Sequence, residues 1–358
     1  MMNNQNRCAC KSPKVMIVGD SRKMKGGVST VIKSMEQSFI WKKYHCYWLQ
    51  CQINKGILWK LLYLFRALCI ALFKLPCYDI IHIHTTPGMG MKVIYPFFIY
   101  AKLWNKRTIL HLHVGNQITY HKDNKFFLKT MNKANRVVVL GKMWKDFLER
   151  DMNVQTPVYY LYNPVLAQPL GNNAKKYFLF AAFFNINKGY DTLLSAFAKV
   201  VKRYPEWKLV MCGTSDAETT AKVRSYIKQN GLSASVELPG WVDGSLRMQY
   251  FQEAYAYCMT SKQEGLPMSV LESMSYGVPV ISTPVGCLPE FLKNEESALF
   301  FDFGNAEMLA KQMEALIISP ILREKLAHEG RELVSKYFIP EVVFSKLDTI
   351  YQNLYTKC

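Results

Sequence analysis

This chain of 358 residues is long for one domain and natural for two of about 165 to 190 residues. Half of the residues are hydrophobic, which indicates a globular protein with sizeable cores and excludes a disordered or fibrous chain. Residues 1–165 hold 25 Lys and Arg against 7 Asp and Glu, whereas residues 166–358 hold 20 of each, so the first half carries the whole net charge of +18. This imbalance favours an anionic partner for the first half.

Short apolar strands alternate with helical segments along the first half of the chain. Residues 14–19 (KVMIVG) are typical of a buried strand, and the loop at Gly26 and Gly27 leads into a helix near residues 29–35. Further strands are expected at 80–84, 108–113 and 137–140. Such alternation predicts a parallel, doubly wound α/β sheet.

Two longer segments of this half, residues 57–74 and 91–107, mix Leu, Phe and Trp with Lys and Arg. Charges interrupt both of them, so neither offers the run of about 20 apolar residues that crosses a bilayer. This composition suits an anionic membrane surface better than nucleic acid. The alternative is that both are core helices with Lys and Arg along the rim.

The second half repeats the alternation after a polar linker at residues 163–176. Strands are expected at 177–180, 208–212, 236–238, 256–259 and 278–282, and a last helix from about residue 340. We therefore divide the chain into 1–165, 166–339 and 340–358. The ten cysteines form no C-x-x-C pair, and the polar start MMNNQNRCACKSPK has no apolar region, so we expect a cytoplasmic protein.

The segment 261–290 (SKQEGLPMSVLESMSYGVPVISTPVGCLPE) is the most informative. It places Glu264 and Glu272 around a turn shaped by glycine and proline and followed by a helix that begins near Met268. Free N–H groups at a helix start favour phosphate, whereas carboxylates accept hydrogen bonds from sugar hydroxyls. This combination suits a sugar nucleotide.

The same block resembles the signature of the family-4 glycosyltransferases, which are retaining enzymes of the GT-B fold. The resemblance implies two Rossmann-like domains facing a cleft, and transfer of a hexosyl group from a nucleoside-diphosphate sugar without a cofactor. It implies that Glu264 contacts the hexose and Glu272 the ribose. The other donor-binding residues that it implies are Gly265, Leu266, Pro267, Met268, Ser269, Gly26, Gly27 and Glu290.

Two further positions extend the resemblance. Asn187-Lys188-Gly189 is similar to the family's K-G motif, whose lysine neutralises the donor diphosphate. His113 ends a strand, and we expect it to hydrogen-bond the donor or the acceptor, whereas His82, His84 and His111 are interpreted as structural. For Glu290, donor contact and helix capping stay open.

One position departs from the family pattern. The family usually has an arginine five residues before the lysine, where this chain has Phe183. Either another cation, such as Arg22 or Lys25, replaces it, or the enzyme is slow. The chain has no Asp-x-Asp set, so we expect no metal site.

The basic first domain favours a glycan acceptor linked to lipid at the inner face of the cytoplasmic membrane. Synthesis of a bacterial capsule, exopolysaccharide or O-antigen is therefore the leading hypothesis. The alternatives are a GT-B protein that binds sugar nucleotides without catalysis, and a sugar-nucleotide epimerase of the same fold.

Overall fold

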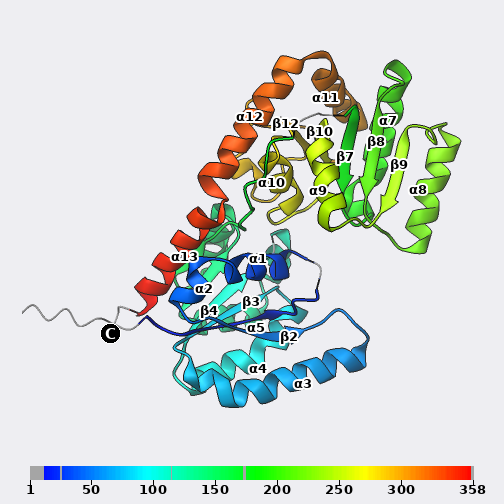
Figure 1. Cartoon of the computed structure of the whole chain (residues 1–358). Coiled ribbons are helices and arrows are strands. Elements are labelled where there is room, and N and C mark those ends of the chain that lie inside the picture. The colour runs from blue at the N-terminus through cyan, green and yellow to red at the C-terminus, as the bar shows by residue number, and fades with distance from the viewer. Residues whose placement is uncertain (1–11, 25, 114, 172–174, 356–358) are drawn as a thin grey trace, which may run out of the picture.

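The computed structural model describes residues 12–355 except 25, 114 and 172–174. Two parallel six-stranded sheets form the framework, one in each half of the chain (Figure 1). The first has the strand order β2-β1-β3-β4-β5-β6 and the second β12-β11-β10-β7-β8-β9. In both sheets the order reverses direction, which is the doubly wound arrangement that the alternation predicts.

The strands of the first sheet are β1 (Val15–Asp20), β2 (Tyr47–Gln52), β3 (Ile80–Thr85), β4 (Arg107–Leu112), β5 (Arg136–Val139) and β6 (Val158–Tyr160). Its helices are α1 (Gly27–Glu36), α2 (Phe39–Lys43), α3 (Ile57–Lys74), α4 (Met89–Leu103), α5 (Lys125–Lys133) and α6 (Lys142–Asp146), the last continued by a π-helical turn at Phe147–Asp151. The sequence missed β2 and β6. The strand β2 (YWLQCQ) mixes polar with aromatic residues because it lies at the edge of the sheet.

The strands of the second sheet are β7 (Tyr177–Ala181), β8 (Lys208–Cys212), β9 (Val236–Gly240), β10 (Ala256–Met259), β11 (Val280–Ser282) and β12 (Leu299–Phe300). Its helices are α7 (Tyr190–Arg203), α8 (Ala217–Gln229), α9 (Gly244–Glu253), α10 (Met268–Ser275), α11 (Ala306–Ile318) and α12 (Pro320–Tyr337). All five strands expected here are present, with ends shifted by up to two residues, and only the two-residue β12 was missed.

The last helix, α13 (Pro340–Tyr355), returns to the first sheet (Figure 1). Its buried side chains, among them Phe344 and Leu347, share a hydrophobic cluster with Val15 and Ile17 of β1. The chain therefore crosses between the two sheets twice, once through the segment after β6 and once before α13.

The two apolar and basic segments of the first half fold as helices with opposite surroundings. Helix α4 buries Ile94, Phe97 and Phe98 completely, so it is a core helix, as the alternative interpretation predicts. Helix α3 buries only Ala67 and Ala71, and Phe65 and Phe73 are 67% and 81% exposed. For α3 the core-helix interpretation is wrong, because its large apolar side chains point to solvent. Within residues 12–355, as far as they are described, no helix is long and apolar enough to cross a membrane.

Candidate functional site

An ion pair between Lys188 and Glu264 lies at the centre of the predicted site. Lys188 ends a short 3-10 turn after β7, and Glu264 lies in the loop after β10, so both follow the carboxyl ends of neighbouring strands. The Lys188 ammonium contacts Oε1 of Glu264, and the Ser261 hydroxyl donates to the same oxygen at 2.7 Å. The two ion-paired side chains are 29% and 16% exposed, so the charges are neutralised but accessible.

The backbone around Lys188 is held tightly. The Asn185 side chain accepts a hydrogen bond from the Lys188 amide at 3.1 Å, and the Thr260 hydroxyl donates to the Lys188 carbonyl at 2.6 Å. Gly189 has φ +64°, and a Cβ there would lie 2.2 Å from the Thr260 carbonyl oxygen, so only glycine fits. The ammonium is thus presented from a fixed turn.

Helix α10 begins beside Glu264. Pro267 precedes its first residue with φ −72°, and Ser269 accepts a hydrogen bond from the Tyr257 hydroxyl at 2.7 Å. Leu266 is 6% exposed and Gly265 accepts from the Cys287 amide at 2.9 Å, so these two residues shape the turn. Among the predicted donor-binding residues here, Met268 and Ser269 supply the first backbone amides of the helix, which favour an anion.

The first sheet meets this turn at Gly115. A Cβ on Gly115 would lie 2.3 Å from the Glu264 carbonyl oxygen, so the loop after β4 contacts the Glu264 backbone directly. His113 lies two residues before Gly115, and its amide donates to the Thr85 carbonyl at 2.9 Å. The structure therefore brings His113, Glu264 and Lys188 to the same junction between the two sheets.

His113 belongs to a block of four stacked imidazoles on β3 and β4. His84 and His111 are paired across the strands, and His82 lies two residues before His84 on the same face. His84 Nδ1 is hydrogen-bonded to His113 Nε2 at 2.7 Å, and His82 to His111 at 3.3 Å and to the Tyr351 hydroxyl at 2.6 Å. The two hydrogen-bonded pairs stack on each other, with ring centroids 4.2 and 4.4 Å apart.

Burial keeps these imidazoles neutral. Desolvation lowers the pKa of His113 to about 3. Desolvation first, and repulsion between neighbouring imidazoles second, hold the pKa of His82, His84 and His111 well below the usual value. His82, His84 and His111 also offer ring nitrogens within 4.8 Å of one another. His82 Nδ1 is engaged by the Tyr351 hydroxyl and His82 Nε2 by His111 Nδ1, which suits a packed neutral block better than a metal site.

Glu272 faces a cavity of about 640 Å³ between α1 and helices α9 and α10. Gly26, Gly27 and Met268 also line it, so three of the predicted donor-binding positions share this space with Glu272. Arg247 of α9 binds Glu272 through two hydrogen bonds, of which the one from Nε to Oε1 is 3.0 Å long. Arg247 was not predictable from the sequence, because no motif surrounds it and only the fold brings α9 beside α10.

Two cations, Arg22 and Lys25, were proposed to replace the arginine that is missing at Phe183. Phe183 is 48% exposed. Arg22 is paired with Glu36 and lies 4.9 Å from the Trp48 ring, so its charge is already engaged. Lys25 lies outside the described residues. At the Glu272 cavity the structure places Lys33 of α1 and Arg247, and Arg247 is paired with Glu272.

Glu290 connects the two sheets. Its carboxylate accepts hydrogen bonds from the amides of Lys142 and Met143 at 2.9 and 2.7 Å, and from the Tyr162 hydroxyl at 2.8 Å. Of the two interpretations left open, the contacts favour capping over donor contact. The capped helix is α6 of the first sheet and not the next helix in the chain.

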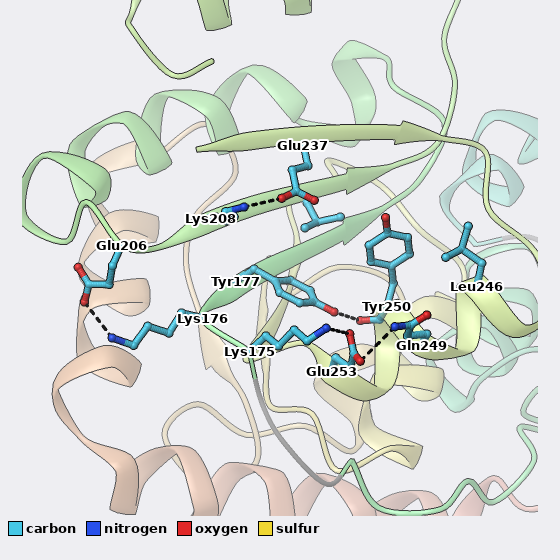
Figure 2. A pocket seen from close by; sticks show the side chains of 11 residues that line it. Lys175, Lys176, Tyr177, Glu206, Lys208, Glu237, Leu246, Gln249, Tyr250 and Glu253 are labelled. Carbon is cyan, nitrogen blue, oxygen red and sulfur yellow. Dashed lines mark hydrogen bonds and ion pairs between the residues drawn. The ribbon is translucent and has the colours of Figure 1, made fainter. Parts of the chain in front are cut away.

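A separate cavity of about 460 Å³ lies at the opposite ends of β7, β8 and β9, where these strands begin (Figure 2). Its charges neutralise one another in the pairs Lys175–Glu253, Lys176–Glu206 and Lys208–Glu237. Ligands of open α/β sheets bind beyond the carboxyl ends of strands, and this cavity lies at the amino ends. We therefore place the candidate functional site at the Lys188–Glu264 pair and the Glu272 cavity.

Comparisons with known proteins identify the family and the fold. Residues 166–333 match the family model "Glycosyl transferases group 1". The chain is 23% identical to the 2-deoxystreptamine N-acetyl-D-glucosaminyltransferase of Niallia circulans, over 78% of this chain and 76% of that protein. It is also 23% identical to the capsular polysaccharide biosynthesis glycosyltransferase CapM of Staphylococcus aureus, over 76% of this chain and 70% of that protein.

Among solved structures, Anabaena Alr3699/HepE in complex with UDP superimposes with a TM-score of 0.75 at 14% identity, covering 95% of this chain and all of that one. At this identity the likeness shows the fold alone, and that fold is GT-B. This protein is therefore a glycosyltransferase whose residues 166–333 belong to the glycosyl transferases group 1 and whose fold is GT-B.

Proposed function

We propose that this protein is a retaining, metal-independent hexosyltransferase. It would move a hexosyl group from a nucleoside-diphosphate sugar to a hydroxyl of a lipid-linked glycan during synthesis of a bacterial surface polysaccharide. Relatives in capsule biosynthesis support the pathway class. The observation that carries the proposal is the Lys188–Glu264 pair, placed just before α10 and against the Gly115 backbone of the first domain.

The chemistry assigned to these groups follows from their charge. The bond between the anomeric carbon and the diphosphate oxygen breaks, and a bond from that carbon to the acceptor oxygen forms on the same face of the sugar. The proton of the acceptor hydroxyl ends on the leaving diphosphate. Lys188 and the first amides of α10 would stabilise the growing negative charge, as a divalent cation does elsewhere. Glu264 and His113 would hold hydroxyl groups of the hexose or the acceptor.

A transfer assay with a panel of UDP-, GDP- and ADP-sugars tests this function, each with and without Mg²⁺, and with a polyprenyl-diphosphate-linked sugar as acceptor. We expect one donor to give a product of retained anomeric configuration, with the same rate in EDTA. Release of nucleotide and an epimerised free sugar without acceptor would identify an epimerase instead. Donor binding without turnover would identify a non-catalytic binding protein.

Helix α3 supports the membrane part of the proposal. Its exposed apolar side chains are Ile57, Leu58, Trp59, Leu61, Leu62, Phe65, Leu72 and Phe73. The helix runs along the edge of the first domain that points away from the second (Figure 1). Lys60, Arg66 and Lys74 lie on the same helix, which contains no acidic residue. An apolar surface with only positive charges matches the interface of an anionic bilayer.

Vesicle flotation tests this contact. We expect the protein to float with vesicles containing phosphatidylglycerol at low salt, and to be released at high salt. Leu62→Ser together with Phe65→Ser should abolish flotation. As a matched control, Ile321→Ser changes an apolar residue that is 82% exposed on α12 and should leave flotation unchanged. Absence of flotation at low salt would indicate a soluble acceptor.

A further inference from the structure

We propose that Arg247 is a positioning residue that fixes the Glu272 carboxylate for recognition of two neighbouring hydroxyls of the donor's ribose. The inference rests on the proposed function and assigns a role to a residue that no sequence motif marks. The ligand class is a ribonucleotide, as opposed to a 2′-deoxyribonucleotide.

The geometry is that of a two-point clamp. Arg247 Nε donates to Glu272 Oε1 at 3.0 Å and Nη2 donates to Oε2 at 2.5 Å, so each carboxylate oxygen receives one hydrogen bond. The guanidinium also lies 4.6 Å from the Phe251 ring, and Phe251 is fully buried. Planar bidentate pairing and stacking together hold both side chains in one orientation.

The lone-pair sites of the Glu272 carboxylate that Arg247 does not occupy determine which ligand groups Glu272 can bind. A carboxylate has about four lone-pair sites, and Arg247 occupies one on each oxygen. One site on each oxygen stays available, and Glu272 lines the cavity of about 640 Å³. Two acceptors on adjacent oxygens match two hydroxyls on adjacent carbons, which a ribose offers and a 2′-deoxyribose does not.

Binding of phosphate by Arg247 is the competing role. Nε and Nη2 are already engaged by Glu272, so the side-on edge of the guanidinium is occupied and only the end-on pair of Nη N–H groups stays available for a phosphate. The charge of Arg247 is also matched by Glu272, so the pair as a whole attracts an anion weakly. The contacts therefore favour the positioning role.

Calorimetric titration separates the two roles. We would measure binding of UDP, GDP and ADP, of their 2′-deoxy counterparts and of the free nucleosides to the full-length protein. The variants are Arg247→Met, Glu272→Gln and the double variant. Arg203→Met is the matched control, because Arg203 binds Glu314 through two hydrogen bonds of 3.1 and 2.9 Å outside the cavity.

We expect the wild-type protein to bind one ribonucleotide about tenfold or more tightly than its 2′-deoxy form. Arg247→Met should reduce that ratio to near one, as should Glu272→Gln, and the double variant should lower it no further. Arg203→Met should keep the wild-type ratio. Circular dichroism would verify that each variant is folded.

Three outcomes would overturn the inference. If Arg247→Met keeps the ribose preference, Arg247 does not position Glu272. If it weakens binding of the diphosphate but not of the nucleoside and keeps the preference, Arg247 is a phosphate ligand. If the wild-type protein binds a nucleotide without ribose preference, Glu272 does not read the diol, while binding of no nucleotide at all would instead refute the proposed function.

Discussion

The two sheets share strand number, direction and winding, but the first domain buries neutral imidazoles, whereas the second holds ion-paired carboxylates. The first sheet buries His82, His84 and His111 in β3 and β4, next to a partly buried His113 that follows β4, and desolvation keeps these imidazoles neutral. The second domain places Glu264 after the carboxyl end of β10 and Glu272 on α10, and it pairs each carboxylate with a cation. An imidazole can give up its charge near neutral pH, whereas a carboxylate cannot, so a partly buried carboxylate needs a partner.

This contrast also separates the roles that we assign. Neutral imidazoles can pack and accept hydrogen bonds, but they cannot offset the charge of a diphosphate. Paired charges can be reorganised when a charged ligand arrives. We therefore expect disturbances of His82, His84 and His111 to change stability, and disturbances of the paired charges of the second sheet to change binding and turnover.

Acid should have the largest effect, and it should act on the first sheet. Because the pKa values of the four histidines are lowered in the folded protein, the unfolded chain binds more protons below about pH 6.5. Stability is complete above that pH and is lost as the pH falls towards the folded pKa values, at roughly 1 kcal/mol per histidine by pH 5.5.

Urea unfolding at pH 7.5 and 5.5 measures this loss, and hydrogen exchange locates it. Peptides of β3 and β4 should lose protection before those of β7 and β8. In His111→Phe, which keeps a ring at this position, the pH dependence should be smaller than in the wild-type protein. Equal stability at both pH values would mean that the imidazoles are not neutral in the folded state.

The second-largest effect should come from removal of the Lys188 ammonium, and it should lower turnover. We expect Lys188→Ala to lower kcat/KM by about 10²- to 10³-fold, since it removes the cation that we propose stabilises the leaving diphosphate. Lys199→Ala breaks an exposed Lys–Glu pair on the same domain and should leave kcat/KM unchanged. A loss of less than threefold in Lys188→Ala would remove Lys188 from the site.

Truncation of matched phenylalanines compares α3 with α4. Phe97→Ala empties a fully buried position of α4 and should destabilise the protein by about 3–5 kcal/mol. Phe65→Ala on α3 should stay within about 0.5 kcal/mol, because that side chain is 67% exposed. Urea unfolding of both variants gives the difference, and similar losses would place α3 in the core.

The smallest effect should come from the contact between the sheets. Glu290→Gln keeps a hydrogen-bond acceptor but removes the negative charge at the start of α6, so we expect a loss of about 1 kcal/mol. Thermal unfolding measures it, and the KM for the donor should stay unchanged. A raised donor KM at equal stability would restore Glu290 to the donor-binding residues.

The amino-acid sequence by itself determined the α/β alternation, the segment with Glu264, Glu272 and the start of α10, and the Lys188 turn. These features depend on neighbours in the chain, since hydrophobic period, glycine and proline act locally. A buried strand such as β1 was predictable because both of its faces are apolar.

Only the tertiary structure decided the partners of Glu272 and Glu290 and the exposure of α3 and α4, because these features depend on residues far apart in the chain. Arg247 meets Glu272 25 positions later, and Glu290 caps a helix that begins 148 positions before it. Helices α3 and α4 have similar compositions, and their opposite exposure follows from what packs on each. Composition sets how much apolar surface a helix carries, and the fold sets how much of it is covered.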